Sequence, residues 1–247
     1  MLEINSVSVF YENALALNDL NIDVQQGEIV GVFGSNSAGK TTLFNTIAGL
    51  TLHLKRREQR KGGERITITG SIRFQGEEIS LSKPSDRVEK GIILCRERHP
   101  VFRDNTVEEN LRLGGYMRSG SEIKESLQFV YDLFPPLLRL KNKKAGMLSG
   151  GEQEMVAVGM ALMARPKLLL MDEPLLGLSP LMQKEVVRAV KKIRQQGVTI
   201  LLSEQYARPV MPIIDRGYVI ENGTLVVSGT GQELMDNPEA KAAYFGM

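Results

Sequence analysis

The segment Gly34–Thr42 (GSNSAGKTT) constrains the fold more than any other part of this 247-residue chain. It satisfies the pattern G-x-x-x-x-G-K-[ST] in the required context, because the apolar run 28–33 precedes it and the helix-like sequence LFNTIAGL follows it. Glycines in such a loop let backbone N–H groups approach phosphate oxygens. The pattern therefore predicts an α/β fold in which a buried strand ends at a phosphate-binding loop.

Every residue of this loop is a candidate nucleotide ligand. The Lys40 ammonium is expected to reach the β- and γ-phosphate oxygens, which makes it a candidate catalytic residue, and the Thr41 hydroxyl is expected to bind Mg²⁺. The candidate nucleotide-binding set of the loop is Gly34, Ser35, Asn36, Ser37, Ala38, Gly39, Lys40, Thr41 and Thr42.

A second apolar run, Leu168–Met171, ends in two acidic residues, Asp172 and Glu173. Taken alone, such a run is typical of an ordinary buried strand with solvated ends. Combined with the phosphate loop, it indicates chemistry: Asp172 is placed to bind Mg²⁺, and Glu173 to polarise an attacking water as general base.

The run Leu148–Gln153 places a Ser-Gly-Gly turn at the start of a helix, about 110 residues after the phosphate loop. Backbone N–H groups at a helix N-terminus form an anion-binding surface. One triphosphate rarely needs two such surfaces, whereas two facing chains can each close the other's nucleotide site. Ser149, Gly150 and Gly151 are therefore candidates for a second anion-binding surface, one that could close the nucleotide site of a facing chain.

Hydrophobic periodicity predicts how the rest of the chain is organised. Residues 2–10 and 20–24 alternate apolar and polar positions as half-buried antiparallel strands do, whereas 28–33, 167–171 and 198–202 are continuous apolar runs typical of buried strands.

Further strands are expected over 66–76 and a hairpin turn at 221–223, whereas 106–165 has helical spacing. We expect one domain over residues 1–247, with a helical subdomain over about 106–165. The segment His53–Ile66, with six Lys or Arg against two Glu, is interpreted as a solvated surface insertion, with a partner-binding patch as the alternative.

Composition limits the other possibilities. A net charge of +2 gives no support for binding to nucleic acid or to an anionic membrane surface. The single cysteine, Cys95, is expected to be a buried apolar residue. The sequence has neither a secretory signal nor a run of the roughly 18–20 apolar residues that span a bilayer. We therefore expect a cytoplasmic protein whose membrane role depends on other subunits.

Taken together, these motifs resemble the ATP-binding subunit of an ATP-binding cassette (ABC) transporter over essentially the whole chain. The resemblance implies an α/β fold: a P-loop NTPase, RecA-like core with an antiparallel β-subdomain and an inserted helical signature subdomain. It also implies ATP and Mg²⁺ as cofactors. Tyr11 falls where the family places an aromatic ring that stacks on adenine, although an ordinary strand aromatic is the alternative.

The sequence departs from the common family pattern at four places. Glu97 stands where the family usually has Gln, as a candidate Mg²⁺ ligand, and Gln205 replaces the switch histidine as a candidate catalytic residue. Gly177–Pro180 replaces a loop that usually ends in Asp, and Ser37 stands where Gly is commoner. The first three departures resemble the smaller ATPase of branched-chain amino acid importers, a subgroup that includes relatives for amides and urea. Glu204 and the C-terminal residues Ala243, Tyr244, Phe245 and Gly246 fit the same subgroup.

The resemblance implies a set of partners. They are a paralogous ATPase subunit in a hetero- or homodimer, two transmembrane permease subunits and an extracytoplasmic substrate-binding protein, with this chain attached peripherally to the inner face of the cell membrane. Two alternatives remain: an exporter ATPase of the lipopolysaccharide type, and a soluble ABC ATPase that acts on DNA or ribosomes. Gln205 disfavours the first, and the lack of sustained heptads or a second cassette disfavours the second.

Overall fold

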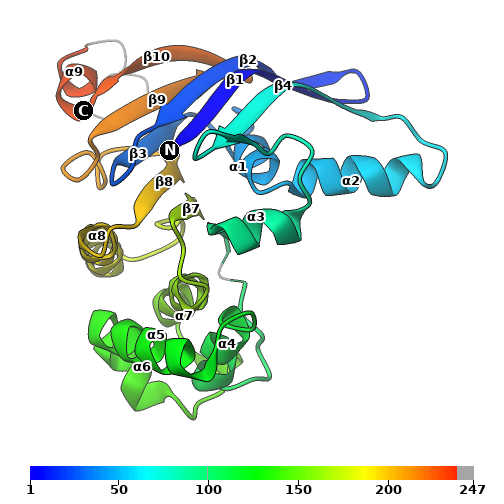
Figure 1. Ribbon diagram of the computed structural model, residues 1–247. Coiled ribbons are helices and arrows are strands. Elements are labelled where there is room, and N and C mark those ends of the chain that lie inside the picture. The colour runs from blue at the N-terminus through cyan, green and yellow to red at the C-terminus, as the bar shows by residue number, and fades with distance from the viewer. Residues whose placement is uncertain (99, 238–247) are drawn as a thin grey trace.

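A mixed six-stranded sheet forms the centre of the computed structural model, which describes residues 1–98 and 100–237 (Figure 1). Five of its strands are parallel, and only β10 at one edge is antiparallel to its neighbour. In spatial order the strands are β10 (Thr224–Thr230), β9 (Arg216–Glu221), β3 (Ile29–Phe33), β8 (Thr199–Glu204), β7 (Leu168–Asp172) and β6 (Ile92–Cys95). The three strands predicted from continuous apolar runs are β3, β7 and β8, and all are fully buried.

An antiparallel sheet in the order β2-β1-β4-β5 packs beside the first sheet. Its strands are β1 (Leu2–Tyr11), β2 (Ala14–Val24), β4 (Ile66–Phe74) and β5 (Glu77–Glu78). The prediction of strands over 2–10, 20–24 and 66–76 is confirmed, although the second begins at Ala14. Alternate residues of β1 and β2 are buried, which explains the alternating pattern in the sequence.

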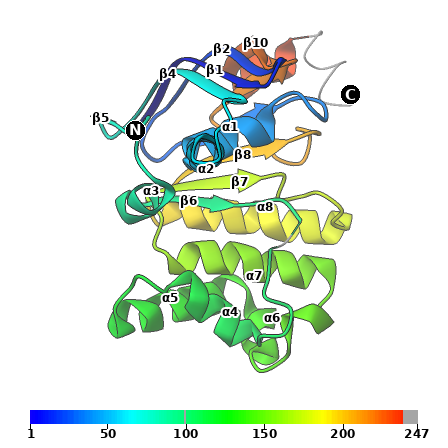
Figure 2. The same ribbon diagram turned by 90° about the vertical axis from the view of Figure 1, so that its right-hand side faces the viewer.

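Four helices from the stretch with helical spacing, α4 (Val107–Gly114), α5 (Gly120–Leu133), α6 (Pro135–Leu140) and α7 (Gly150–Met163), lie together below the central sheet (Figures 1 and 2). Pro135 and Pro136 occupy the first turn of α6, where proline is tolerated. The remaining helices are α1 (Lys40–Ile47), α2 (Leu50–Gln59), α3 (Pro84–Lys90), α8 (Pro180–Gln195) and α9 (Gly231–Asp236).

The basic segment after α1 differs from a simple surface insertion, because much of it forms helix α2. Gly49, with φ of 80°, ends α1 and begins α2. Lys, Arg, Glu, Gln and Leu are good helix formers, and Arg56 and Arg57 in the last turn complement the helix dipole. Its solvated character is as expected, since only Thr51 and Leu52 of α2 are buried.

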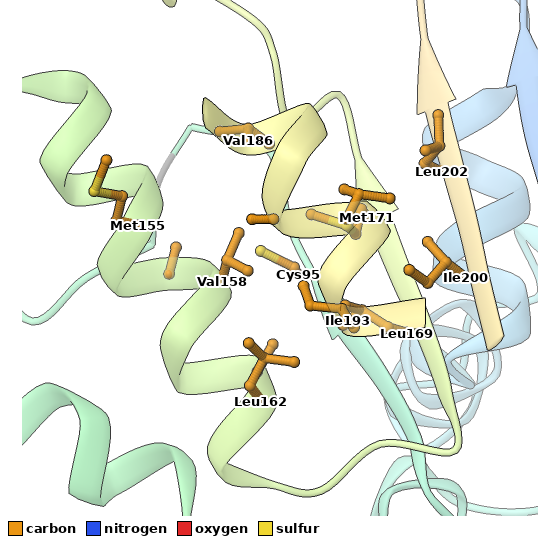
Figure 3. Packing of buried hydrophobic residues seen from close by; sticks show 14 of the residues in the cluster. Cys95, Met155, Val158, Leu162, Leu169, Met171, Val186, Ile193, Ile200 and Leu202 are labelled. Carbon is orange, nitrogen blue, oxygen red and sulfur yellow. The ribbon is translucent and has the colours of Figure 1, made fainter. Parts of the chain in front are cut away.

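The core is divided into two clusters by the central sheet. Leu169 and Met171 of β7 contribute to the cluster with α7 and α8, whereas Leu168 and Leu170 contribute to the cluster on the other face. Cys95 is buried in the first of these clusters, among side chains of α7, α8 and β7 (Figure 3). Burial raises the pKa of its thiol well above the usual range, so the predicted role as a small apolar residue is confirmed.

The hairpin predicted at 221–223 joins β9 to β10. Asn222 and Gly223 have φ of 46° and 78°, the two positive values that a tight hairpin turn requires. The C-terminal residues Ala243–Gly246 lie outside the described residues. Within residues 1–98 and 100–237, no helix has both the length and the apolar character needed to cross a membrane.

Candidate nucleotide-binding site

Parallel pairing brings the functional segments to one edge of the central sheet. Phe33, the last residue of β3, pairs with Glu204 of β8, and Asp172 of β7 pairs with Ser203 of β8. The phosphate loop, the two acids and the segment before Gln205 therefore start from adjacent strand ends. In open α/β sheets, ligands bind at this carboxyl edge.

Close backbone packing explains the two glycines of the phosphate loop. A Cβ at Gly34 would lie 2.3 Å from the carbonyl oxygen of Ile220, and one at Gly39 would lie 2.7 Å from that of Ala16. Ser37 has φ of 68°, a left-handed conformation that favours glycine. The loop thus keeps its geometry with serine at a position where the family more often has glycine, at a cost in backbone strain.

The Lys40 side chain is buried inside the loop and lies beside Glu173. Its ammonium donates to the carbonyl oxygens of Gly34 at 2.7 Å and Ser35 at 2.9 Å. It also lies 3.1 Å from Oε1 of Glu173. Glu173 itself has φ of 49°, and residues held in such sparsely populated conformations cluster at functional sites.

A cleft of about 670 Å³ opens over the loop. It brings together Tyr11 from the antiparallel sheet, Glu97 from the segment after β6, and Glu173. The full lining is Tyr11, Ala16, Asn36, Ser37, Ala38, Gly39, Lys40, Thr41, Thr42, Glu97, Arg98, Glu173 and Leu176. Most of the residues predicted from the sequence to bind nucleotide therefore line a single cleft, whereas Ala16, Arg98 and Leu176 had not been expected there.

Asp172 lies beneath this cleft rather than in its lining. Its carboxylate accepts a hydrogen bond from the Ser203 hydroxyl at 2.7 Å and a second from the Thr41 side chain. Burial raises the pKa of Asp172, and these hydrogen bonds oppose the shift. The carboxylate and the Thr41 hydroxyl thus form a pair of oxygen donors next to the phosphate loop.

Two of the predicted residues lie at the edge of the site. Glu97 is half-buried, and its Oε1 lies 3.7 Å from Nε of Arg98. Gln205, also half-buried, directly follows β8 and is absent from the lining of the cleft among the described residues.

Ser149, Gly150 and Gly151 form the start of α7, apart from the residues that line the cleft. Ser149 caps the helix: its hydroxyl accepts from the backbone N–H of Glu152 at 3.4 Å, and its own N–H donates to the Glu152 carboxylate at 2.8 Å. Gly151 packs against Met182, because a Cβ there would lie 2.7 Å from that side chain. Ser149 and Gly150 are exposed, and neither of them lines the nucleotide cleft of this chain.

Sequence reasoning missed Ser203 and gave Glu204 no structural role. The backbone N–H of Glu173 donates to the Ser203 hydroxyl at 3.1 Å, so Ser203 holds both acids at the end of β7. Glu204 is buried, and its Oε1 accepts from the N–H of Leu175 at 2.9 Å. Desolvation raises the pKa of Glu204 to about 8. The only signal in the sequence was two polar residues ending an apolar strand.

The raised pKa of Glu204 predicts a pH-dependent stability. The folded protein keeps this proton up to about pH 8, whereas the unfolded chain loses it near the ordinary value of 4.5. The folded state therefore binds more protons between these values, and the free energy of unfolding falls as pH rises through that window.

In Glu204→Gln the amide oxygen can still accept from the N–H of Leu175, and the side chain has no proton to lose. We expect the variant to match the native protein near pH 5 and to exceed it by about 2–5 kcal/mol near pH 8. Thermal unfolding at both pH values measures this difference, and equal pH slopes for the two proteins would exclude it.

A phosphate loop after β3, two acids at the end of β7 and a capped helix N-terminus outside the cleft define a P-loop NTPase. The family model described as "ABC transporter" matches residues 17–176, so the chain belongs to the ABC transporter family and is an ATPase. The resemblance inferred from the motifs is thereby confirmed.

Known relatives refine this assignment. The high-affinity branched-chain amino acid transport ATP-binding protein BraG of Pseudomonas aeruginosa is 39% identical, with 100% of each chain covered. The probable branched-chain amino acid transport ATP-binding protein LivF of Archaeoglobus fulgidus is 31% identical, covering 100% of this chain and 99% of its own. The lipopolysaccharide export system ATP-binding protein LptB of Haemophilus influenzae is 29% identical, covering 96% of this chain and 93% of its own. Among solved structures, a nucleotide-free ATP-binding cassette from an ABC transporter has a TM-score of 0.82 and 26% identity, covering 100% of this chain and 99% of its own.

Proposed function

We propose that this chain is the ATP-hydrolysing subunit of an ABC importer for branched-chain amino acids or related amides. The observation that carries the proposal is the full-length similarity to BraG, which exceeds the similarity to the exporter subunit LptB. Gln205 and Glu97, where the family more often has His and Gln, fit the same subgroup. ATP binding would close a dimer of ATPase subunits and drive the membrane subunits.

The contacts of the cleft support a role for each side chain. Lys40, held by two loop carbonyls, would bind β- and γ-phosphate oxygens through the same N–H groups. Glu173 lies in the cleft lining next to Lys40, and this position supports a role in which its carboxylate accepts a proton from an attacking water. Tyr11, the last residue of β1, lines the cleft and would provide a ring on which adenine stacks.

Mg²⁺ fits the donor atoms at this site. Asp172 and Thr41 are already hydrogen-bonded, and Glu97 adds a second carboxylate at the cleft. Oxygen donors of this kind are those that Mg²⁺ prefers. When bound, Mg²⁺ would neutralise charge on the β- and γ-phosphates, with Thr41, Asp172 and Glu97 as the residues that hold it. Ser203 would keep the Asp172 carboxylate in place for this role.

The start of α7 is proposed as the half-site that this chain offers to a facing subunit. Ser149 and Gly150 are exposed and outside the chain's own cleft. The backbone N–H groups and the positive end of a 14-residue helix favour a phosphate there. The facing subunit would be a paralogous ATPase or a second copy, and Gln205 would act as the switch residue between the two. In this proposal residues 1–247 form one ABC ATPase domain, with about 106–165 as its helical subdomain.

A second, largely apolar groove of about 360 Å³ supports contact with the permease subunits. It lies between α3 and β6 on one side and α4 and α7 on the other, and its lining includes Val88, Ile92, Met160 and Ala161. Arg96, directly before Glu97, also lines this groove. A permease segment bound here would therefore touch the chain that leads into the nucleotide cleft. This contact would hold the protein at the inner face of the cell membrane, with an extracytoplasmic binding protein delivering substrate on the other side.

Purification of the trapped complex tests this proposal. The Glu173→Gln variant is isolated from native membranes with ATP and Mg²⁺, and its bound proteins are identified. We expect two multi-span permeases and a second ATPase, and reconstituted vesicles of the native complex should accumulate a branched-chain amino acid with ATP. Recovery of a lipopolysaccharide-export partner set, or of no membrane subunit, would contradict it.

A further inference from the structure

Helix α2 carries a basic groove that the proposed ATPase function leaves unused. The groove measures about 390 Å³ and is lined by Leu52, His53, Arg56, Arg57, Arg60, Lys83 and Pro84. Four of these seven side chains are Arg or Lys, and no carboxylate is among them. We call this surface the α2 basic groove.

Neighbouring acids offset the cations of the α2 basic groove only in part: the Asp86 carboxylate accepts from the Lys83 backbone N–H at 3.1 Å and also interacts with the Lys83 charge. Within residues 1–98 and 100–237, none of its four Arg and Lys side chains makes an ion pair, and Arg57, Arg60 and Lys83 are exposed. The nearby Glu58 contacts Arg65 instead, with Oε1 3.6 Å from Nε. The groove thus has an excess of positive charge, although the net charge of the whole chain is only +2.

The positive charge of the groove also affects a neighbouring buried arginine, Arg87. The Arg87 guanidinium is fully buried and donates to backbone carbonyls, including those of Thr46 and Ile47 at 2.7 Å. Burial and, to a smaller extent, the positive charge of Arg56 together lower the pKa of Arg87 to about 10, and the Asp86 carboxylate opposes the shift. Arg56 in turn donates to the carbonyl oxygen of Leu81 at 2.9 Å, which fixes one wall of the groove.

The position of α2 indicates what it faces. The helix projects away from the two sheets in Figure 1, and Figure 2 views it nearly end-on, on the same side as α3, β6 and α4. This is the side that carries the apolar permease groove, and Pro84 lines both grooves. A helix of ten residues is about 15 Å long, so its basic end extends beyond the surface that would meet the permease.

Exposed apolar side chains accompany the charges. Leu81 is 75% exposed and Leu54 is 45% exposed, and both flank the basic residues of α2. Basic side chains combined with exposed leucines are typical of surfaces that bind the interface of an anionic bilayer. An arginine pair also fits a phosphate well, because its planar N–H fork donates two parallel hydrogen bonds.

We propose that the α2 basic groove binds the phosphate headgroups of anionic lipids at the cytoplasmic face of the membrane. The orientation rests on the proposed permease groove, whereas the lipid contact uses only residues of this chain. An acidic permease segment is the less favoured occupant, because cytoplasmic loops of membrane proteins carry an excess of Lys and Arg. The inner leaflet, in contrast, has a negative surface potential that attracts such clusters.

Vesicle binding by the full chain alone tests the proposal. The native protein is sedimented with vesicles of phosphatidylcholine, with or without phosphatidylglycerol, at two salt concentrations. The test variant replaces Arg57, Arg60 and Lys83 by Gln, all of them exposed. The matched control replaces Lys184, Arg188 and Lys191 of α8 by Gln, which are exposed and line a different groove. Each triple change lowers the net charge by three, from +2 to −1.

We expect the native protein to bind only the anionic vesicles, with weaker binding in high salt, and the α2 variant to bind at least about tenfold more weakly. The α8 control should bind nearly as the native protein does. Inorganic phosphate, added at constant ionic strength, should not displace the protein if the ligand is a headgroup at a surface. Equal loss in both variants, displacement by phosphate, or no binding by the native protein would overturn the proposal. The proposal would also be overturned if the α2 variant failed to co-purify with permeases from native membranes but still bound anionic vesicles as the native protein does. Because no permease or ATP is present in the vesicle assay, its result does not depend on the transport function.

Discussion

Replacing Glu173 by Gln is expected to lower ATP turnover by about 10²–10⁴-fold while ATP binding is retained. The amide has the same shape as the carboxylate, and its oxygen can still face Lys40. In the native protein, Nζ of Lys40 lies 3.1 Å from Oε1 of Glu173. It cannot accept the proton of an attacking water, so the loss falls on the chemical step. Turnover in the assembled complex and equilibrium ATP binding to the same variant measure the two effects separately.

Glu204→Gln is the informative comparison for this experiment. Both carboxyls are buried at the ends of neighbouring strands, but burial raises the pKa of Glu204 to about 8, so this group is mainly protonated at neutral pH. Its amide replacement should therefore stay within a few-fold of native turnover at pH 7. If Glu173→Gln hydrolysed ATP at the native rate, or if both variants lost turnover equally, Glu173 would not be the base.

The parts of the site that were predictable from the sequence are those defined by local patterns. The phosphate loop needs a strand before it and a helix after it, and both are visible within about 20 residues. Asp172 and Glu173 follow an apolar run directly. Tyr11 and Glu97 came from the family resemblance, and the cleft lining contains both.

Ser203 and Glu204 could not be assigned roles because these depend on strand order. The Ser203 hydroxyl bonds to Asp172, 31 positions away, only because β8 lies between β3 and β7 in the sheet. An apolar run in the sequence predicts a buried strand without naming its neighbours. The strand order therefore determines which polar residues support the two acids.

The basic segment shows a different limit. Its charges gave no apolar stripe from which to predict a helix, yet good helix formers and the break at Gly49 produce α2. The net charge of +2 also concealed a local excess of positive charge, because acids elsewhere in the chain cancel it. Composition averages over the surface, whereas binding depends on which charges the fold places together.

The second large effect is expected from Gly150→Glu at the start of α7. If this surface meets the triphosphate held by a facing subunit, a carboxylate there would oppose the phosphates directly. Like charges placed together across an interface cost several kcal/mol, so turnover of the assembled complex should fall by at least about 10²-fold. ATP binding by the isolated chain should not change, because α7 begins outside the chain's own cleft.

Gly120→Glu provides a matched control for this change. Gly120 is also the exposed first residue of a helix, after a capping serine, Ser119, and before a capping glutamate, Glu122. A Cβ at Gly120 would meet no atom within 4 Å. The control thus adds the same charge to the same kind of helix start without approaching a phosphate, and it should keep native turnover. If the isolated Gly150→Glu chain lost ATP binding, the start of α7 would instead belong to the chain's own nucleotide site. If both variants slowed ATP turnover equally, a carboxylate that destabilises the helix start would explain the loss, and no contact with a facing subunit's phosphates would be needed.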